Sequence, residues 1–77
     1  MNMTTISVYD SRIVRIPYNF FPKNEIEWKE KESEVIRTLS EMFGPSWTVG
    51  KIEDNNIEYA VEVQFIRQSY DVVCDLR

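Results

Sequence analysis

Asp71, Cys74 and Asp75 come nearest to a catalytic arrangement in this chain. Its 77 residues include no histidine and one cysteine, and histidine is the usual proton carrier near neutral pH. A cysteine nucleophile needs a neighbouring base that takes the proton from its thiol. On an extended strand, residues 71 and 75 point to one side and Cys74 to the other, so neither carboxylate is placed as that base. We therefore expect no catalytic residue, and we expect Cys74 to pack as a small hydrophobic residue in the core.

Ligands for a metal or a cofactor are also scarce. The run Glu53-Asp54-Asn55-Asn56 offers oxygen atoms, but it lacks the spaced ligands and the glycine of a calcium loop. A plain turn is the simpler interpretation of that run. Gly44 and Gly50 do not form a glycine-rich phosphate loop. The sequence therefore predicts no bound metal and no cofactor.

Negative charge is the next feature that bears on function. The chain carries 13 acidic and 9 basic residues, for a net charge of −4, and six glutamates fall within residues 24–43. A chain of this charge repels the phosphates of DNA and RNA, so we expect no direct binding of nucleic acid. A larger protein with a basic surface is the partner that this charge favours.

The composition is typical of a single folded domain spanning residues 1–77. Hydrophobic residues make up 43% of the chain and aromatic residues 13%, which is enough for a small core. A lone cysteine cannot form an internal disulfide, which favours a reducing compartment. The first residues lack the pattern of a secretion signal, and no apolar run approaches the ~20 residues that span a bilayer. We expect a cytoplasmic protein without membrane contact.

The most regular segment predicts a helix between Asn24 and Gly44. Asn24 is a favourable N-cap, and Glu27 stands three residues on, as in a capping box. Gly44 followed by Pro45 is a stop signal. At about 100° per residue, one arc of this helix is apolar and should cover the core: Trp28, Val35, Ile36, Leu39, Met42 and Phe43. The opposite arc is acidic: Glu27, Glu30, Glu34 and Glu41.

Glu32 breaks this pattern, because it falls within the apolar arc. A buried charge without a partner is costly. Either the first helical turns overhang the sheet and leave Glu32 in water, or Glu32 pairs with a cation such as Arg15 or Lys51.

Alternating apolar residues predict a strand pair before the helix. We interpret Thr4–Ile16 as two strands joined at Asp10-Ser11-Arg12, a connection that sets Val8 opposite Val14. The connector at residues 17–22 holds two prolines, which exclude a regular helix. Its three rings form either a lid over one end of the core or an exposed binding point, and the lid is the preferred interpretation.

Strands are also predicted after the helix. Ile57–Ile66 alternates cleanly and should pair with Trp47–Glu53. A three-residue turn over residues 54–56 sets Val49 opposite Val61 and places Asn56 in the left-handed region.

Tyr70–Leu76 is expected to form one further, closing strand. The predicted order is therefore ββαβββ. It describes an α+β fold in which a single helix packs on one face of an antiparallel sheet.

These features favour a non-catalytic protein-binding module. More specifically, we expect a small acidic inhibitor that covers a basic, nucleic-acid-binding surface of a larger protein, as phage-encoded inhibitors of bacterial defence systems do. The plain alternative for the helix is a solvated acidic face that keeps the protein soluble. A homodimer that pairs through its open sheet face or an edge strand is the alternative function. The candidate partner-binding residues are Glu27, Glu30, Glu34, Glu58, Glu62, Tyr9, Tyr18, Phe20 and Phe21.

Overall fold

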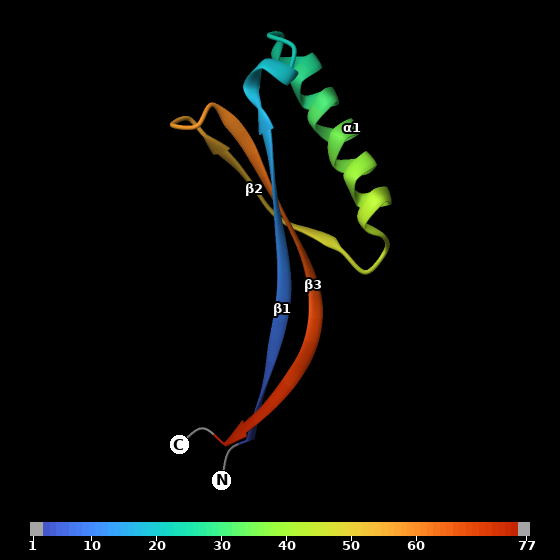
Figure 1. Cartoon of the computed structure of the whole chain (residues 1–77), viewed down its shortest axis with the longest axis vertical. Coiled ribbons are helices and arrows are strands. Elements are labelled where there is room, and N and C mark those ends of the chain that lie inside the picture. Colours follow the sequence, from blue (N-terminus) through green and yellow to red (C-terminus); the bar gives the residue numbers. More distant parts are fainter. Residues whose placement is uncertain (1–2, 76–77) are drawn as a thin grey trace.

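The computed structural model describes residues 3–75 as one helix lying on a three-stranded antiparallel sheet (Figure 1). Strand β1 (Met3–Pro17) leads through a short 3-10 helix, η1 (Tyr18–Phe20), into helix α1 (Glu25–Phe43). Strands β2 (Thr48–Asn55) and β3 (Ala60–Asp75) follow, and the sheet order is β1-β3-β2. The expected α+β fold with a helix packed on a sheet is confirmed.

The predicted number of strands is wrong. Thr4–Ile16 lies within the single strand β1, and the residues expected at Tyr70–Leu76 continue β3 as far as Asp75, with Leu76 outside the described residues. The order is therefore βαββ. Asp10, expected in a turn, lies directly opposite Arg67 of β3, and Val14 lies opposite Val63 instead of Val8. The polar residues at 10–12 therefore belong to an extended strand, because a partner strand distant in sequence pairs with them.

A β-bulge in β3 explains why its alternation changes phase. Val8 lies opposite Tyr70 and Tyr9 lies opposite Gln68, so Ser69 is an extra residue without a partner in β1. Before the bulge, odd-numbered residues of β3 face the helix, as buried Val63 and Phe65 show. After it, even-numbered residues take over that face. The apolar positions of β3 thus shift from odd to even numbers within one continuous strand. In the sequence, this shift looks like the boundary between two strands.

The core lies between α1 and the half of the sheet that carries β2. Its buried hydrophobic residues come from the sheet and from the connectors: Ile16, Phe21, Trp47, Ala60, Val61, Val63 and Phe65. The helix residues packed against them are partly buried: Trp28, Val35, Ile36, Leu39 and Phe43. These residues confirm the predicted apolar arc except for Met42, which is 74% exposed. Met42 lies in the last turn, at the edge of the arc.

The predicted N-cap at Asn24 and the predicted stop at Gly44 are both confirmed. The Asn24 side chain accepts hydrogen bonds from the backbone N–H groups of Ile26 and Glu27, at 2.9 and 3.2 Å. The N–H of Gly44 donates to the carbonyl of Ser40 at 3.0 Å. Gly44 has a φ of 99°, in the region that favours glycine.

The turn between β2 and β3 differs from the prediction. Asn55 pairs with Ala60, which leaves a four-residue loop over residues 56–59, and Val49 lies opposite Phe65 instead of Val61. Tyr59, with a φ of 52°, takes the left-handed conformation expected for Asn56. The Asn55 side chain accepts hydrogen bonds from the N–H groups of residues 57 and 58, which stabilises this longer loop.

The two long strands extend well past the helix. We call this extension the arm, and define it as residues 3–9 of β1 and 68–75 of β3. In Figure 1 the arm projects as a two-stranded ribbon below α1 and β2, and both ends of the described range, Met3 and Asp75, lie at its tip. The molecule measures 56 × 28 × 18 Å as a result.

Candidate protein-binding surfaces

The outer face of α1 carries the first group of predicted binding residues. Glu27, Glu30 and Glu34 are all exposed. Cations stand among them: Lys31 Nζ lies 4.0 Å from a carboxylate oxygen of Glu34, and Lys29 and Arg37 line the same shallow surface as Glu30. These three cations equal the three glutamates in number, so this part of the helix face is of mixed charge.

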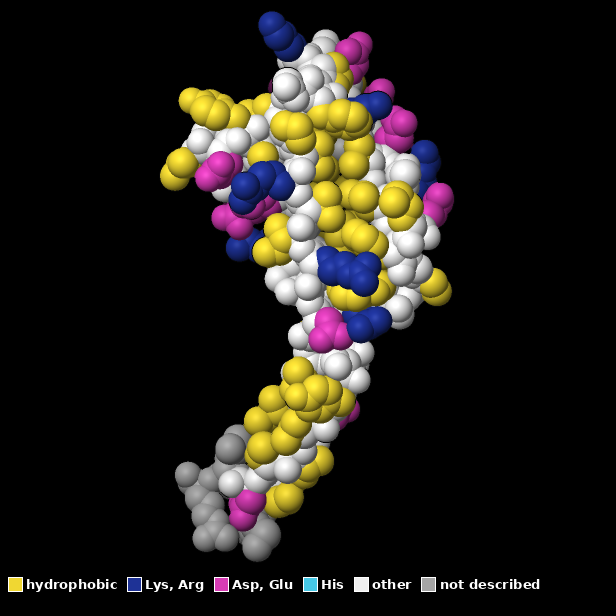
Figure 2. All heavy atoms as spheres, viewed as in Figure 1, with side chains coloured by type: hydrophobic (Ala, Val, Ile, Leu, Met, Phe, Trp, Pro, Cys, Tyr) yellow, Lys and Arg dark blue, Asp and Glu magenta, His cyan; other side chains and the backbone are white. Residues whose placement is uncertain are grey.

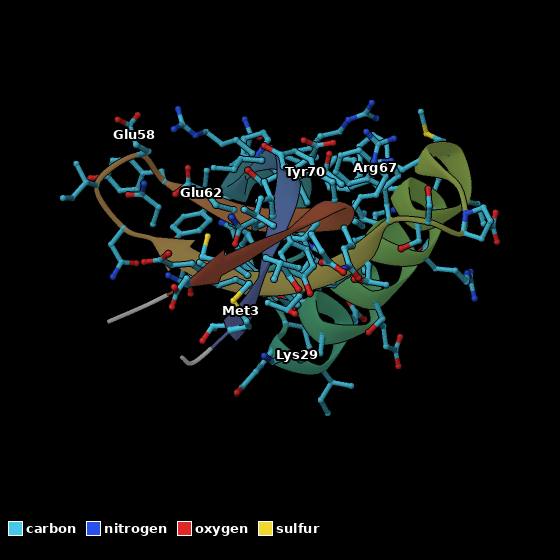
Figure 3. All side chains as sticks on the ribbon, turned by 90° about the horizontal axis from the view of Figure 1, so that it is seen from below. Met3, Lys29, Glu58, Glu62, Arg67 and Tyr70 are labelled. Carbon is cyan, nitrogen blue, oxygen red and sulfur yellow. The ribbon has the colours of Figure 1, made fainter. Side chains whose placement is uncertain are left out.

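Glu58 and Glu62, the second group, lie on the other side of the molecule. Figure 3, viewed along the arm, shows both across the sheet from α1, which carries Lys29. Residue 62 points away from the helix because its neighbours Val61 and Val63 point toward the core. The structure therefore does not bring the helix glutamates and the sheet glutamates together on one surface.

Arg15 forms ion pairs with both Glu62 of β3 and Glu58 of the β2–β3 turn. Its guanidinium lies 3.1 Å from Glu62 and 3.9 Å from Glu58. Asn55 Nδ2 also donates to Glu62 Oε1 at 3.1 Å. The hydrogen bond from Asn55, followed by that from Arg15, lowers the pKa of Glu62 below its ordinary value. Both carboxylates are engaged within the chain, so they are less available to a partner than the sequence indicated.

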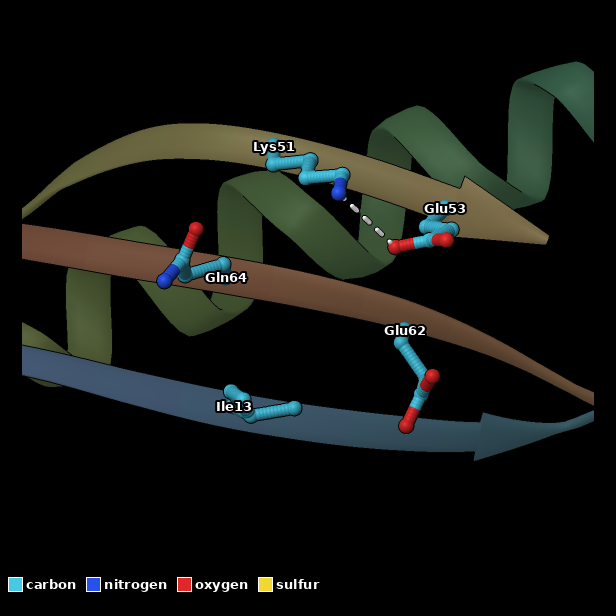
Figure 4. Close-up of a pocket in the computed structure, with 5 residues that line it drawn as sticks. All are labelled: Ile13, Lys51, Glu53, Glu62 and Gln64. Carbon is cyan, nitrogen blue, oxygen red and sulfur yellow. Dashed lines mark ion pairs between the residues drawn. The ribbon is translucent and has the colours of Figure 1, made fainter. Parts of the chain in front are cut away.

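A small hollow lies on this outer face of the sheet, lined by Ile13, Lys51, Glu53, Glu62 and Gln64. Figure 4 shows that the side chains come from all three strands, with Lys51 Nζ 3.1 Å from Glu53. Glu53 lies directly opposite Glu62, a like-charge pairing that is unfavourable alone. Lys51 and Arg15 each offset one of these charges. Within residues 3–75, no group of three or more acidic or cysteine ligands could hold a metal ion.

The connector rings fall into two kinds. Phe21 is buried and stacks on Trp28 at 4.4 Å between ring centroids, and Tyr18 meets Trp28 edge-on at 5.5 Å. The preferred interpretation, a lid over the end of the core, is therefore confirmed for these two residues. Phe20 is instead 49% exposed, with Lys31 Nζ 5.0 Å from its ring centroid. Phe20 is the member of the set that a partner could reach.

Tyr18 also ties the connector to the β2–β3 turn. Its hydroxyl donates to Asp54 Oδ1 at 2.6 Å and lies 2.9 Å from Asn56 Oδ1. The hydrogen bond to Asp54, together with burial and the charge of that carboxylate, raises the pKa of Tyr18 to about 12. The phenol is therefore a structural donor at neutral pH.

Glu32 is partly buried and has no ion pair with any residue from 3 to 75. Arg15 and Lys51, the two cations considered for it, pair with other carboxylates. The cation-pairing alternative is therefore wrong.

The arm carries a group of apolar residues that the sequence did not reveal as one surface. Three pairs of directly opposite residues form a face without any charged side chain, which we call the neutral face: Thr4 with Cys74, Ile6 with Val72, and Val8 with Tyr70. Cys74 is partly buried there and is not part of the core, so its predicted place is wrong. In Figure 2, hydrophobic side chains gather along the visible side of the arm. The sequence feature that indicated this face is the shift of the apolar residues from odd positions up to Phe65 to even positions from Tyr70 onward.

The opposite face of the arm is mixed. Met3, Tyr9 and Val73 are 59%, 52% and 60% exposed, and Tyr9 is the predicted binding residue that lies here. Asp71 shares this face and accepts a hydrogen bond from Gln68 Nε2 at 2.7 Å.

Two arginines separate the arm from the core. The Arg12 and Arg67 guanidiniums lie 4.4 and 4.7 Å from the Trp47 ring centroid, and Arg12 also lies 5.0 Å from that of Phe43. These cation–π contacts close the end of the core. The helix-covered core therefore stops at Trp47.

Comparisons with protein-family models, with curated proteins and with solved structures find no match to this chain. Over residues 3–75, no helix combines the length and apolar character needed to cross a membrane.

Proposed function

We propose that the protein is a non-catalytic protein-binding module, and that the arm is the part that contacts another protein. One observation carries this proposal: within residues 3–75, neither a helix nor a third strand accompanies the arm, yet it exposes large apolar side chains. Met3, Tyr9, Tyr70 and Val73 are each more than half exposed. A two-stranded ribbon alone is marginally stable in water, so a partner that covered it would stabilise the arm and bury apolar surface.

An arm variant tests this proposal against a variant placed elsewhere. Tyr70→Glu puts a charge on the arm, whereas Ile57→Glu puts the same charge on an 88% exposed residue of the β2–β3 turn. We expect the tagged full chain and its Ile57→Glu variant to retain a stoichiometric protein partner when isolated from the native host. Tyr70→Glu should lose that partner. Retention by both variants would contradict a role for the arm.

A more specific proposal is that the protein is an acidic inhibitor that covers a basic, nucleic-acid-binding surface of a larger protein. It is supported by Glu27 and Glu30, which are exposed on α1 and form no ion pair within residues 3–75. The inhibitor would use the helix side, because Arg15 engages the acids of the sheet side.

Salt dependence tests the charge-based form of the proposal. Raising the salt concentration from about 50 to 500 mM screens exposed charges, so affinity for a basic partner should fall. Glu27→Gln and Glu30→Gln should weaken binding in low salt, whereas Glu58→Gln should have less effect. An affinity that does not change with salt would contradict this proposal.

A further inference from the structure

We infer that the neutral face of the arm binds the neutral face of a second copy of this chain, so that two arms pack face to face about a twofold axis. The inference rests on the proposed function, because it names the protein that the arm contacts.

The charge pattern of the arm favours this face for a twofold contact. In such a contact the same patch of both copies meets across the axis. A patch that carries charges of one sign would therefore repel its copy. The neutral face carries no Asp, Glu, Lys or Arg side chain, and its titratable groups are the thiol of Cys74 and the phenol of Tyr70. The opposite face would bring Asp71 of both copies onto one interface, which costs energy through like-charge repulsion. The neutral face is therefore the side of the arm on which two copies can pack without repulsion between like charges.

The shape of the arm also suits its own copy. At ~3.3 Å per residue, the seven residues of β1 in the arm span about 23 Å. Twisted ribbons of the same hand pack well on each other, because their side chains interdigitate across about 10 Å. The Asp10–Arg67 ion pair, 2.7 Å long, marks where the neutral face ends. A face of this length offers on the order of 500 Å² per copy, near the low end for a specific interface, so we expect a micromolar dimer.

The net charge predicts how salt affects this dimer. Each copy carries a charge of −4, and two such copies repel one another at long range. Salt screens that repulsion while leaving apolar burial in place, so the dimer should strengthen as salt increases. An acidic face on a basic partner would respond in the opposite sense.

Sedimentation equilibrium of the full chain tests the inference. Over about 2 to 200 µM, we expect the mass to rise from monomer toward dimer, with tighter association in about 500 mM salt than in about 50 mM. Val72→Glu places a carboxylate in the centre of the neutral face and should weaken association at least ~10-fold. Val73→Glu adds the same charge to the next residue on the opposite face, which is more exposed (60% against 37%), and should retain the dimer.

Two further measurements keep the test decisive. The near-ultraviolet circular dichroism of Trp28 and Trp47, which both pack in the helix-covered core, reports whether each variant keeps its core. In the unaltered chain, alkylation of Cys74, which lies on the neutral face, should slow as protein concentration rises. If Val72→Glu does not fold, this measurement still tests the dimer. Alkylation that slows with protein concentration supports it, and a constant rate contradicts it.

The inference is overturned if the native chain is monomeric at about 200 µM in both salts, or if the two valine variants lose association equally. A monomer that still retains a different protein through its arm would contradict the second copy and leave the proposed function standing. A monomer without any arm-dependent complex would contradict both.

Discussion

Asp10 and Arg67 form an ion pair of 2.7 Å at the point where the helix-covered sheet becomes the arm. They are directly opposite in β1 and β3, and the guanidinium of Arg67 also lies over Trp47. On one side of this pair, side chains are buried under α1. On the other side, the same two strands continue with apolar residues, and no helix or further strand within residues 3–75 covers them. The pair is thus the boundary between a core that stabilises the fold and an apolar surface that no other element within residues 3–75 covers.

Stability should depend on the covered side of this boundary. Phe65 is fully buried and meets Phe43 edge-on at 4.9 Å between centroids. Phe65→Ala removes that packing and leaves a cavity, so it should lower the free energy of unfolding by about 3–5 kcal/mol. Ile57→Ala, at a residue that is 88% exposed, should change it by less than ~0.5 kcal/mol. Urea unfolding measures both, and equal effects would contradict the assigned core.

Alkaline pH should break the hydrogen bond that attaches the connector to Asp54. The pKa of Tyr18 is raised from 10.0 to about 12 by its hydrogen bond to Asp54. Because the folded value lies above the unfolded one, the associated stability is complete below pH 10 and is lost as pH rises toward about 12. Absorbance of ionised tyrosine should show a transition near pH 12 that disappears in Tyr18→Phe and persists in Tyr70→Phe. The same titration curve for all three proteins would refute the Asp54 contact.

Low pH should remove the contribution of Glu62 to the stability of the fold. The hydrogen bonds from Asn55 and Arg15 lower its pKa below the ordinary 4.5, so its stabilising effect is present above pH 4.5 and is lost as pH falls through the folded pKa. Glu62→Gln should therefore be less stable than the native chain at pH 7, and the difference should shrink below pH 4.5. Glu53→Gln, on the facing residue of β2, is the matched control. A difference for Glu62→Gln that stays constant with pH would refute the contacts.

Deletion of Ser69 should be tolerated. Ser69 is the unpaired residue of the bulge, and its removal lets Gln68 and Tyr70 follow one another opposite Tyr9 and Val8. Both faces of the arm keep their residues, although the bend that a bulge introduces is lost. Nuclear Overhauser contacts between Val8 and Tyr70 should persist in this variant. Deletion of Asp71 should abolish the facing of Val72 and Ile6, since it turns Val72 to the other side.

The helix could be predicted in detail because its signals are local. Asn24 caps the backbone N–H groups two and three residues away, and Gly44 ends the helix through its own φ. The outward placement of Glu27, Glu30 and Glu34 follows from the period of the helix itself. Neither prediction needs knowledge of any distant residue.

The strands and the site depended on distant contacts. The phase change between Phe65 and Tyr70 fits either a turn or a bulge, and only the pairing with Val8 and Tyr9 of β1 distinguishes them. In the same way, the availability of Glu62 depends on Arg15, 47 residues earlier in the chain.

The sequence by itself determined one capped helix, the outward placement of its glutamates and an antiparallel sheet, because backbone preferences and side-chain period act over a few residues. The tertiary structure alone decided that β1 and β3 each run as one strand, that the predicted acids lie on two sides, and that no other element within residues 3–75 covers the apolar arm. The physical reason is that strand pairing joins residues far apart in the chain, and one unpaired residue such as Ser69 can shift which side chains share a face.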